Sequence, residues 1–357
     1  MGIAKGIFMV DTHVFAQRLA SGAKKKEGKL ASDVNALTSA GGMAALEPFD
    51  NSDRLLYFMD RYDVNVCVIQ GAFGMNNELN VQIVEKHPDR FVALCRDSQT
   101  QRRAQLGIEP WSIGAACKEL EEQLETGIFK GIGEGFPRDR TQNKKRISWD
   151  ERLEQLCQVM ELARKYKVTV QYHTGLPNGF GGEMNRAKGH FETCDNVNPL
   201  LCHEVAALYP DVPIILGHGG IEGNSYYTVE YEWCLNVAAS HNNVYIETGQ
   251  WWAELYKKPL LDPNIGAEKL VWGTGWGSVM TQSWMPGCVP ETCCNQELKL
   301  GPPAHQPDFW GWSLRELGKL NIPQDDLNLI LGGNAVKIYG IKTPFTRLFK
   351  DYPKKQK

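Results

Sequence analysis

The sequence has no long hydrophobic run and little net charge, and these two absences exclude several classes of protein. No apolar stretch in the 357 residues approaches the length needed to span a membrane. The N-terminal segment reaches Asp11 without the long apolar stretch of a secretory signal. A net charge of −3 does not indicate a basic surface for nucleic acid or anionic lipid. We therefore expect a cytoplasmic protein that binds a small molecule or another protein, and neither nucleic acid nor a membrane.

The ten cysteines lack a regular spacing, which argues against a disulfide framework. Cys67 and Cys95 lie in apolar runs that suit buried, reduced thiols. Possible metal donors near the C-terminus are Cys288, Cys293, Cys294 and His305. Adjacent cysteines at this spacing match no usual zinc motif, so we interpret these as reduced loop cysteines rather than a second zinc site.

Two short β-branched runs each end on a histidine and break at once into glycine. Residues 168–172 precede His173, and residues 212–217 precede His218. Apolar runs of this length, bounded by glycine or proline, predict buried parallel strands. Because α/β barrels keep their chemistry at the carboxyl ends of their strands, both histidines are predicted to lie in one site.

Strand and helix patterns alternate through the rest of the chain. An apolar run at 7–10 leads into His13, and helices are expected at 113–124 and from a cap at Asp150. Further strands are expected at 64–70, 91–95, 129–135, 244–247 and 270–274. This alternation predicts an α/β fold, a (β/α)8 TIM barrel, as one domain over residues 1–357. We expect an insertion at 21–50, a loop at 176–198 over the strand ends, and a C-terminal extension after about residue 340.

The predicted strand exits carry both imidazoles and carboxylates. They are Asp11, His13, Glu134, His173, His218 and Glu247. Such a mixture is the usual ligand set of zinc, iron or manganese. We predict that His13, His173 and His218 share a metal ion with Glu134. Glu134 and Glu247 are also candidate catalytic carboxylates, and the alternative for each is an outer acid that orients a ligand histidine.

The last third of the chain is rich in tryptophan, including Trp251, Trp276 and Trp310. These side chains suit an apolar substrate pocket or a subunit interface, and packing between barrel helices is the commoner alternative. Tyr172, Trp251 and Trp276 are the candidate pocket residues.

Four motifs in order along the chain carry a resemblance to a known family. They are Asp11-Thr12-His13, Tyr172-His173-Thr174-Gly175, Gly217-His218-Gly219-Gly220 and Leu331-Gly332-Gly333-Asn334-Ala335. The chain resembles the amidohydrolase superfamily, in the branch that includes aminocarboxymuconate-semialdehyde and resorcylate decarboxylases. The resemblance implies a metal-dependent barrel that forms dimers. It places Glu134 where relatives have a bridging carboxylated lysine or a glutamate, which implies one or two metal ions per chain.

The chain departs from the family pattern at two positions. Phe15 replaces the second histidine of the first motif, and Gly275 replaces the eighth-strand aspartate that binds metal and takes a proton from the attacking water. Ordinary metal-hydroxide hydrolysis is therefore disfavoured. With fewer imidazoles and more carboxylate, iron or manganese is expected rather than zinc alone.

Three functions remain open on this evidence. The first and favoured one is a subunit of an iron- or manganese-dependent oxygenase that hydroxylates a small molecule, because the site lacks the hydrolytic aspartate but keeps histidine and glutamate ligands. The second is a metal-dependent decarboxylase of a small carboxylic acid, which Phe15 and Gly275 make less favoured. The third is a non-catalytic metal-binding subunit that supports a homologous barrel. In each case we expect a homo- or hetero-oligomer.

Overall fold

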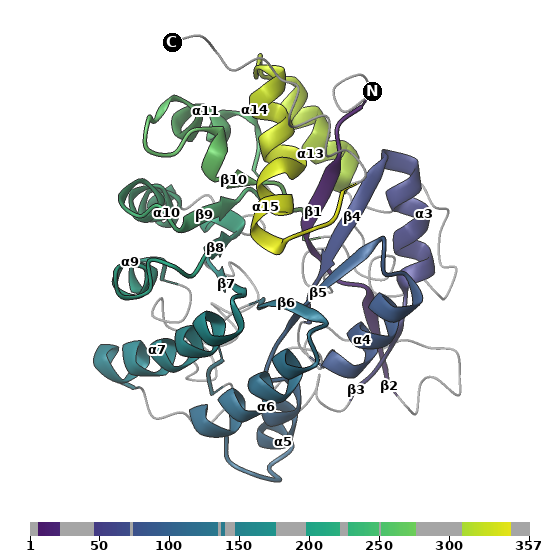
Figure 1. The fold of residues 1–357 in the computed structure, drawn as a ribbon, viewed down its shortest axis with the longest axis vertical. Coiled ribbons are helices and arrows are strands. Elements are labelled where there is room, and N and C mark those ends of the chain that lie inside the picture. Colours follow the sequence, from purple (N-terminus) through teal and green to yellow (C-terminus); the bar gives the residue numbers. More distant parts are fainter. Residues whose placement is uncertain are drawn as a thin grey trace.

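Eight parallel strands form the centre of the protein, and each pairs with the strand of this sheet that follows it along the chain. In this computed structural model, the described residues are 6–21, 46–71, 74–134, 137–139, 147–175, 198–221, 228–249, 251–275 and 309–343. The barrel strands are β1 (Met9–Val14), β4 (Val64–Ile69), β5 (Phe91–Cys95), β6 (Phe129–Ile132), β7 (Thr169–His173), β8 (Ile214–Gly217), β9 (Val244–Glu247) and β10 (Leu270–Val271). Figure 1 shows helices around the outside of these strands.

Backbone hydrogen bonds join the first and last strands. The Thr12 amide donates to the Trp272 carbonyl at 3.0 Å, and the Gly275 amide donates to the His13 carbonyl at 2.9 Å. The sheet therefore closes on itself, which removes its edges. The predicted (β/α)8 barrel is confirmed.

The helices follow the strands in the predicted alternation. They are α3 (Ser52–Tyr62), α4 (Asn77–Lys86), α5 (Ser98–Gln105), α6 (Ile113–Glu125), α7 (Trp149–Tyr166), α9 (Leu200–Leu208), α10 (Thr228–Ser240), α11 (Ala253–Leu261), α13 (Phe309–Gly318), α14 (Gln324–Asn328) and α15 (Asn334–Tyr339). Among the described helices, none is both long and apolar enough to cross a bilayer.

One predicted helix start was wrong. The side chain of Ser148, not Asp150, caps α7, because its hydroxyl accepts a hydrogen bond from the Glu151 amide at 3.1 Å. Asp150 lies in the first turn, where its charge still favours the helix N-terminus. Helix α5 was not predicted, since its sequence is almost entirely polar.

The apolar side chains form two layers. A large cluster that includes Val170, Tyr172 and Leu216 packs between the strands and the helices. A smaller cluster that includes Val10 and Ile215 forms a second core. Alternate residues of a strand thus face opposite layers, as the pleat of a strand requires. The six described cysteines are all free, in agreement with the sequence.

Two short strands, one at each end of the predicted insertion, pair to form a small sheet. Strands β2 (Gln17–Ser21) and β3 (Leu46–Asp50) pair in antiparallel register outside the barrel. Most of the insertion, the loop at 176–197 and the chain after residue 343 lie outside the described residues.

The C-terminal Gly-Gly-Asn motif packs against the start of the barrel. A Cβ atom on Gly332 would lie 1.9 Å from the Phe8 carbonyl oxygen, so only glycine fits there. The Asn334 side chain donates to the carbonyls of Ala267 and Leu270 at 2.8 and 2.7 Å. This motif therefore holds the start of α15 against β1 and β10.

Candidate metal centre

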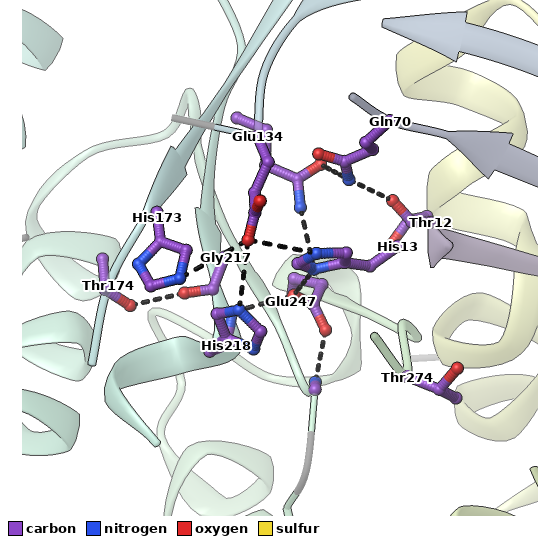
Figure 2. A network of polar contacts seen from close by, with 12 residues as sticks. Thr12, His13, Gln70, Glu134, His173, Thr174, Gly217, His218, Glu247 and Thr274 are labelled. Atoms are coloured by element: carbon purple, nitrogen blue, oxygen red, sulfur yellow. Dashed lines mark hydrogen bonds and ion pairs between the residues drawn. The ribbon is translucent and has the colours of Figure 1, made fainter. Parts of the chain in front are cut away.

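Three histidines converge on one oxygen of Glu134. Oε1 of Glu134 lies 3.5 Å from Nε2 of His13, 3.4 Å from Nε2 of His173 and 3.7 Å from Nε2 of His218. Figure 2 shows the four side chains facing one another. They come from the ends of four strands, β1, β6, β7 and β8, so the topology brings together residues that are far apart in sequence.

Glu247, at the end of β9, orients His13. Its Oε2 lies 2.9 Å from Nδ1 of His13 and also accepts the His218 backbone amide at 2.8 Å. The Nδ1 hydrogen donates to this carboxylate, so a metal ion that displaced the hydrogen on Nε2 would find the Nε2 lone pair on the Glu134 side of the ring. Burial opposes a charge on His13, but the Glu247 and Glu134 carboxylates outweigh it and raise the pKa of His13 to about 10.

Both carboxylates are held in the ionised form. Burial alone would raise their pKa values, yet the neighbouring imidazoles lower the pKa of Glu247 and hold that of Glu134 well below its usual range. The side chain of Glu134 is 15% exposed, whereas that of Glu247 is fully buried. Glu134 is therefore the carboxylate that a substrate can reach.

Two glycines make room for Glu247. A Cβ atom on Gly273 would lie 2.5 Å from Oε1 of Glu247, and one on Gly249 would lie 3.2 Å from the same atom. Gly273 lies two residues after the end of β10, so the exit of the eighth strand leaves free space for the site.

The turn that carries His218 depends on glycine as well. His218 has a φ of 63°, and Gly219 and Gly220 follow with φ values of 52° and 80°. A Cβ atom on Gly219 would lie 2.5 Å from the Trp251 ring, whose Nε1 donates to the His218 carbonyl at 3.1 Å. Trp251 thus supports the turn from behind.

Two glutamines lie beside His13, and sequence analysis missed both. Gln70 donates to the Thr12 carbonyl at 2.9 Å and to Oε1 of Gln171 at 2.8 Å (Figure 2). Nε2 of Gln171 lies 3.4 Å from Nδ1 of His13. Each could have been predicted from its place in the sequence, inside or just after an apolar strand, because a buried amide side chain needs a hydrogen-bond partner.

Asp11 points away from the three histidines. Its carboxylate accepts from the Thr274 hydroxyl at 2.6 Å, from the Trp310 indole at 2.5 Å and from the His13 amide at 3.0 Å. Burial raises its pKa to about 6 against the opposing effect of these hydrogen bonds. Phe15 is buried and packs against the His13 ring, with 5.3 Å between ring centroids.

The donor set fits a divalent metal ion. The ligand atoms of His13, Glu134 and His218 all lie within 4.8 Å of one another, and Nε2 of His13 is buried without a hydrogen-bond partner among the described residues. Four ligands at about 2.1 Å around a tetrahedral ion are about 3.4 Å apart. The three nitrogen-to-oxygen distances of 3.4 to 3.7 Å are close to that spacing.

Two of the three candidate pocket residues are packed in the core, and the third lies outside the described residues. Tyr172 and Trp251 are buried in the core between strands and helices, and Tyr172 lies on the opposite face of β7 from Gln171. Trp276 lies outside the described residues, as do His305 and the cysteines near residue 290.

Several solved structures share the fold at low sequence identity. A 5-carboxyvanillate decarboxylase from Sphingomonas paucimobilis is 13% identical, with a TM-score of 0.54 over 94% of this chain and 100% of that one. A dihydroxybenzoic acid decarboxylase from Polaromonas sp. JS666, with bound manganese and 2-nitroresorcinol, is 15% identical, with a TM-score of 0.54 over 94% and 97%. A zinc-bound amidohydrolase from Burkholderia multivorans is 8% identical, with a TM-score of 0.53 over 94% and 100%.

The sequence itself gives the family. No curated protein matches the chain significantly. The sequence profile described as amidohydrolase matches residues 52–341, which is more than half of the chain. The resemblance inferred from the four motifs is therefore confirmed, and the chain belongs to the amidohydrolase family.

Proposed function

We propose that this protein is a metal-dependent decarboxylase of a small carboxylic acid. The observation that carries the proposal is the convergence of three imidazoles on Glu134 in a family site that has Gly275 in place of the hydrolytic aspartate. Hydrolysis consumes a water molecule that must be deprotonated, whereas decarboxylation breaks a carbon–carbon bond without water. Loss of the aspartate therefore removes hydrolysis and leaves decarboxylation feasible.

The similar structures support this choice over the oxygenase hypothesis. Two of them are named as decarboxylases, and the bound metals named among them are manganese and zinc. Nothing in these comparisons supports an iron-dependent oxygenase. Manganese or zinc is accordingly the proposed ion, held by His13, Glu134, His173 and His218.

A bound divalent ion would supply positive charge to hold the substrate's oxygen atoms and the negative charge that develops as CO2 leaves. Glu247 keeps His13 in the correct tautomer and orientation through the 2.9 Å contact. Bond cleavage leaves an electron pair on the substrate carbon, and a proton must be added there. We assign this proton to solvent water, which can reach the site past His173 and Glu134, the more exposed members of the group at 20% and 15% of their side chains. The hydroxide left behind combines with CO2 as bicarbonate, so the step balances.

The direct test is release of CO2 from a panel of acids by the purified chain loaded with manganese or zinc. The panel includes 5-carboxyvanillate and 2,6-dihydroxybenzoate, and the reaction is run in D2O so that the product carbon acquires deuterium. We expect metal-dependent CO2 release that Glu134→Gln reduces by at least about tenfold, because the variant loses a charged group that would hold the metal ion. A metal-loaded protein that releases no CO2 from any acid in the panel would contradict the proposal.

A further inference from the structure

A buried arginine near the metal-site end of the barrel has an unused pair of donors. Arg152, in the first turn of α7, is only 3% exposed. Its Nη1 donates to the Pro137 carbonyl at 2.7 Å and to Oε1 of Gln155 at 3.2 Å. Nε and Nη2 are buried and have no hydrogen-bond partner in the described part of the chain.

These two unused atoms form one edge of the guanidinium group. Nε–H and Nη2–H are parallel and match the two oxygens of a planar carboxylate in a bidentate pair. Leaving such donors unpaired inside a protein is costly, because a buried charged group loses its hydration without compensation. The geometry therefore suits a planar oxyanion at this edge.

The local charge also favours an anion. Arg138, itself 8% exposed, acts on Arg152 as a like charge. Asp97 acts as an opposite charge, but its Oδ2 already accepts from Gln101 and from Trp111, each at 2.9 Å. Burial, together with the like charge of Arg138, lowers the pKa of Arg152 to about 10, against the opposing effects of Tyr172 and Asp97. Arg138 and Arg152 thus place two buried guanidinium charges near each other.

The position of this group links it to the metal centre. Pro137 comes three residues after Glu134, and Tyr172, whose ring acts electrostatically on Arg152, directly precedes His173. Tyr172 faces the helix layer whereas Gln171 lies beside His13, so Arg152 lies behind the strand that carries His173. The guanidinium edge is therefore at the metal-site end of the barrel but separate from the three histidines.

We propose that Arg152, next to Arg138, binds the carboxylate group of a small molecule. The source is either a free monocarboxylate or a second carboxylate on the substrate itself. Only the second source rests on the proposed decarboxylation, and in both cases occupancy is measured by binding and not by turnover.

The test is the thermal unfolding midpoint of the full chain in sodium acetate and in sodium isophthalate, each compared with sodium chloride at equal ionic strength. A ligand at about ten times its Kd should raise the midpoint by about 1–3 °C. A rise with acetate in the presence of a chelator identifies a free carboxylate as the ligand. A rise with isophthalate only when manganese is bound identifies a substrate group.

Three variants assign the effect to the proposed edge. Arg152→Met should abolish the rise, and Arg152→Lys, which keeps the charge but loses the planar donor pair, should weaken binding by about tenfold. Arg164→Met is the matched control on the same helix, because the Arg164 guanidinium already binds Asp211 at 2.9 to 3.1 Å. If Arg152→Met does not fold, Arg152→Lys alone decides. Equal midpoints in all salts, or a rise that survives the Arg152 substitutions, would overturn the proposal.

Discussion

His13 and Glu247 form the buried pair on which the metal site depends. Glu247 touches the far nitrogen of His13 and the backbone of His218, so it acts on two proposed ligands at once. The sequence left open whether Glu247 is catalytic or an outer acid. Its complete burial and its contact with Nδ1 favour the second role.

Replacing Glu247 with glutamine should therefore weaken metal binding. The variant keeps the shape of the side chain but removes the charge that fixes the His13 tautomer, and we expect the metal Kd to rise by about 10–100-fold. Titration with manganese or zinc measures it. The control is Glu316→Gln, since Glu316 is also buried but binds the Ala253 amide. An unchanged Kd in Glu247→Gln would show that His13 does not need this partner.

His173 is the most exposed of the three histidines, at 20% of its side chain. Replacing it with alanine removes one nitrogen donor without disturbing the buried pair of His13 and Glu247. We expect the purified variant to contain no bound metal by elemental analysis. His203→Ala is the control, because His203 lies on the surface, where its Nδ1 is 2.9 Å from Nε2 of His241 and away from the proposed metal site. Normal metal content in His173→Ala would remove His173 from the ligand set.

At the scale of elements, the end of β9 and the segment after β10 are complementary in size. Glu247 ends β9, and Gly273 beyond β10 leaves the space that its side chain fills. A carboxylate on one strand thus depends on the absence of a side chain on the next.

Gly273→Ala should disrupt the site. Its methyl group would lie 2.5 to 2.7 Å from three atoms of Glu247, so the carboxylate must move away from His13. We expect a destabilisation of about 1–3 kcal/mol, typical of overpacking, together with weaker metal binding. Denaturant unfolding and metal titration check both effects. Gly114→Ala is the control, because nothing lies within 4 Å of its Cβ position in α6 and alanine should stabilise the helix by up to about 1 kcal/mol. Equal metal affinity in both variants would contradict this role for Gly273.

Much of the barrel, and the convergence of His13, Glu134, His173 and His218 at one end of it, could be predicted from the sequence. The strands of a parallel sheet are buried on both faces, so they stand out as apolar runs, and the residues at their ends meet at one face. The partners of each side chain could not be predicted. Asp11 is next to His13 in the first motif yet turns toward Thr274 and Trp310, because the direction of a side chain depends on local backbone geometry that periodicity does not give.

At the scale of the whole molecule, the prediction of an oligomer remains to be tested. The family resemblance implies dimers, and two family groups are missing from the site, at Phe15 and Gly275. We expect the isolated chain to elute as a dimer or larger assembly in size-exclusion chromatography with light scattering. Co-expression with a homologous barrel subunit should increase solubility or activity if the assembly is mixed. A stable monomer that turns over substrate unaided would contradict this expectation.

The central claim is that His13, Glu134, His173 and His218 hold a divalent ion. Anomalous X-ray diffraction from crystals grown with manganese, recorded on both sides of the manganese absorption edge, tests it most directly. The account predicts one strong peak at about 2.0–2.3 Å from the imidazole nitrogens and from the Glu134 carboxylate, the usual range for such ligands. A second peak nearby would indicate a two-metal site around the same carboxylate. The absence of a peak among these four residues, or a peak held by other groups, would contradict the claim.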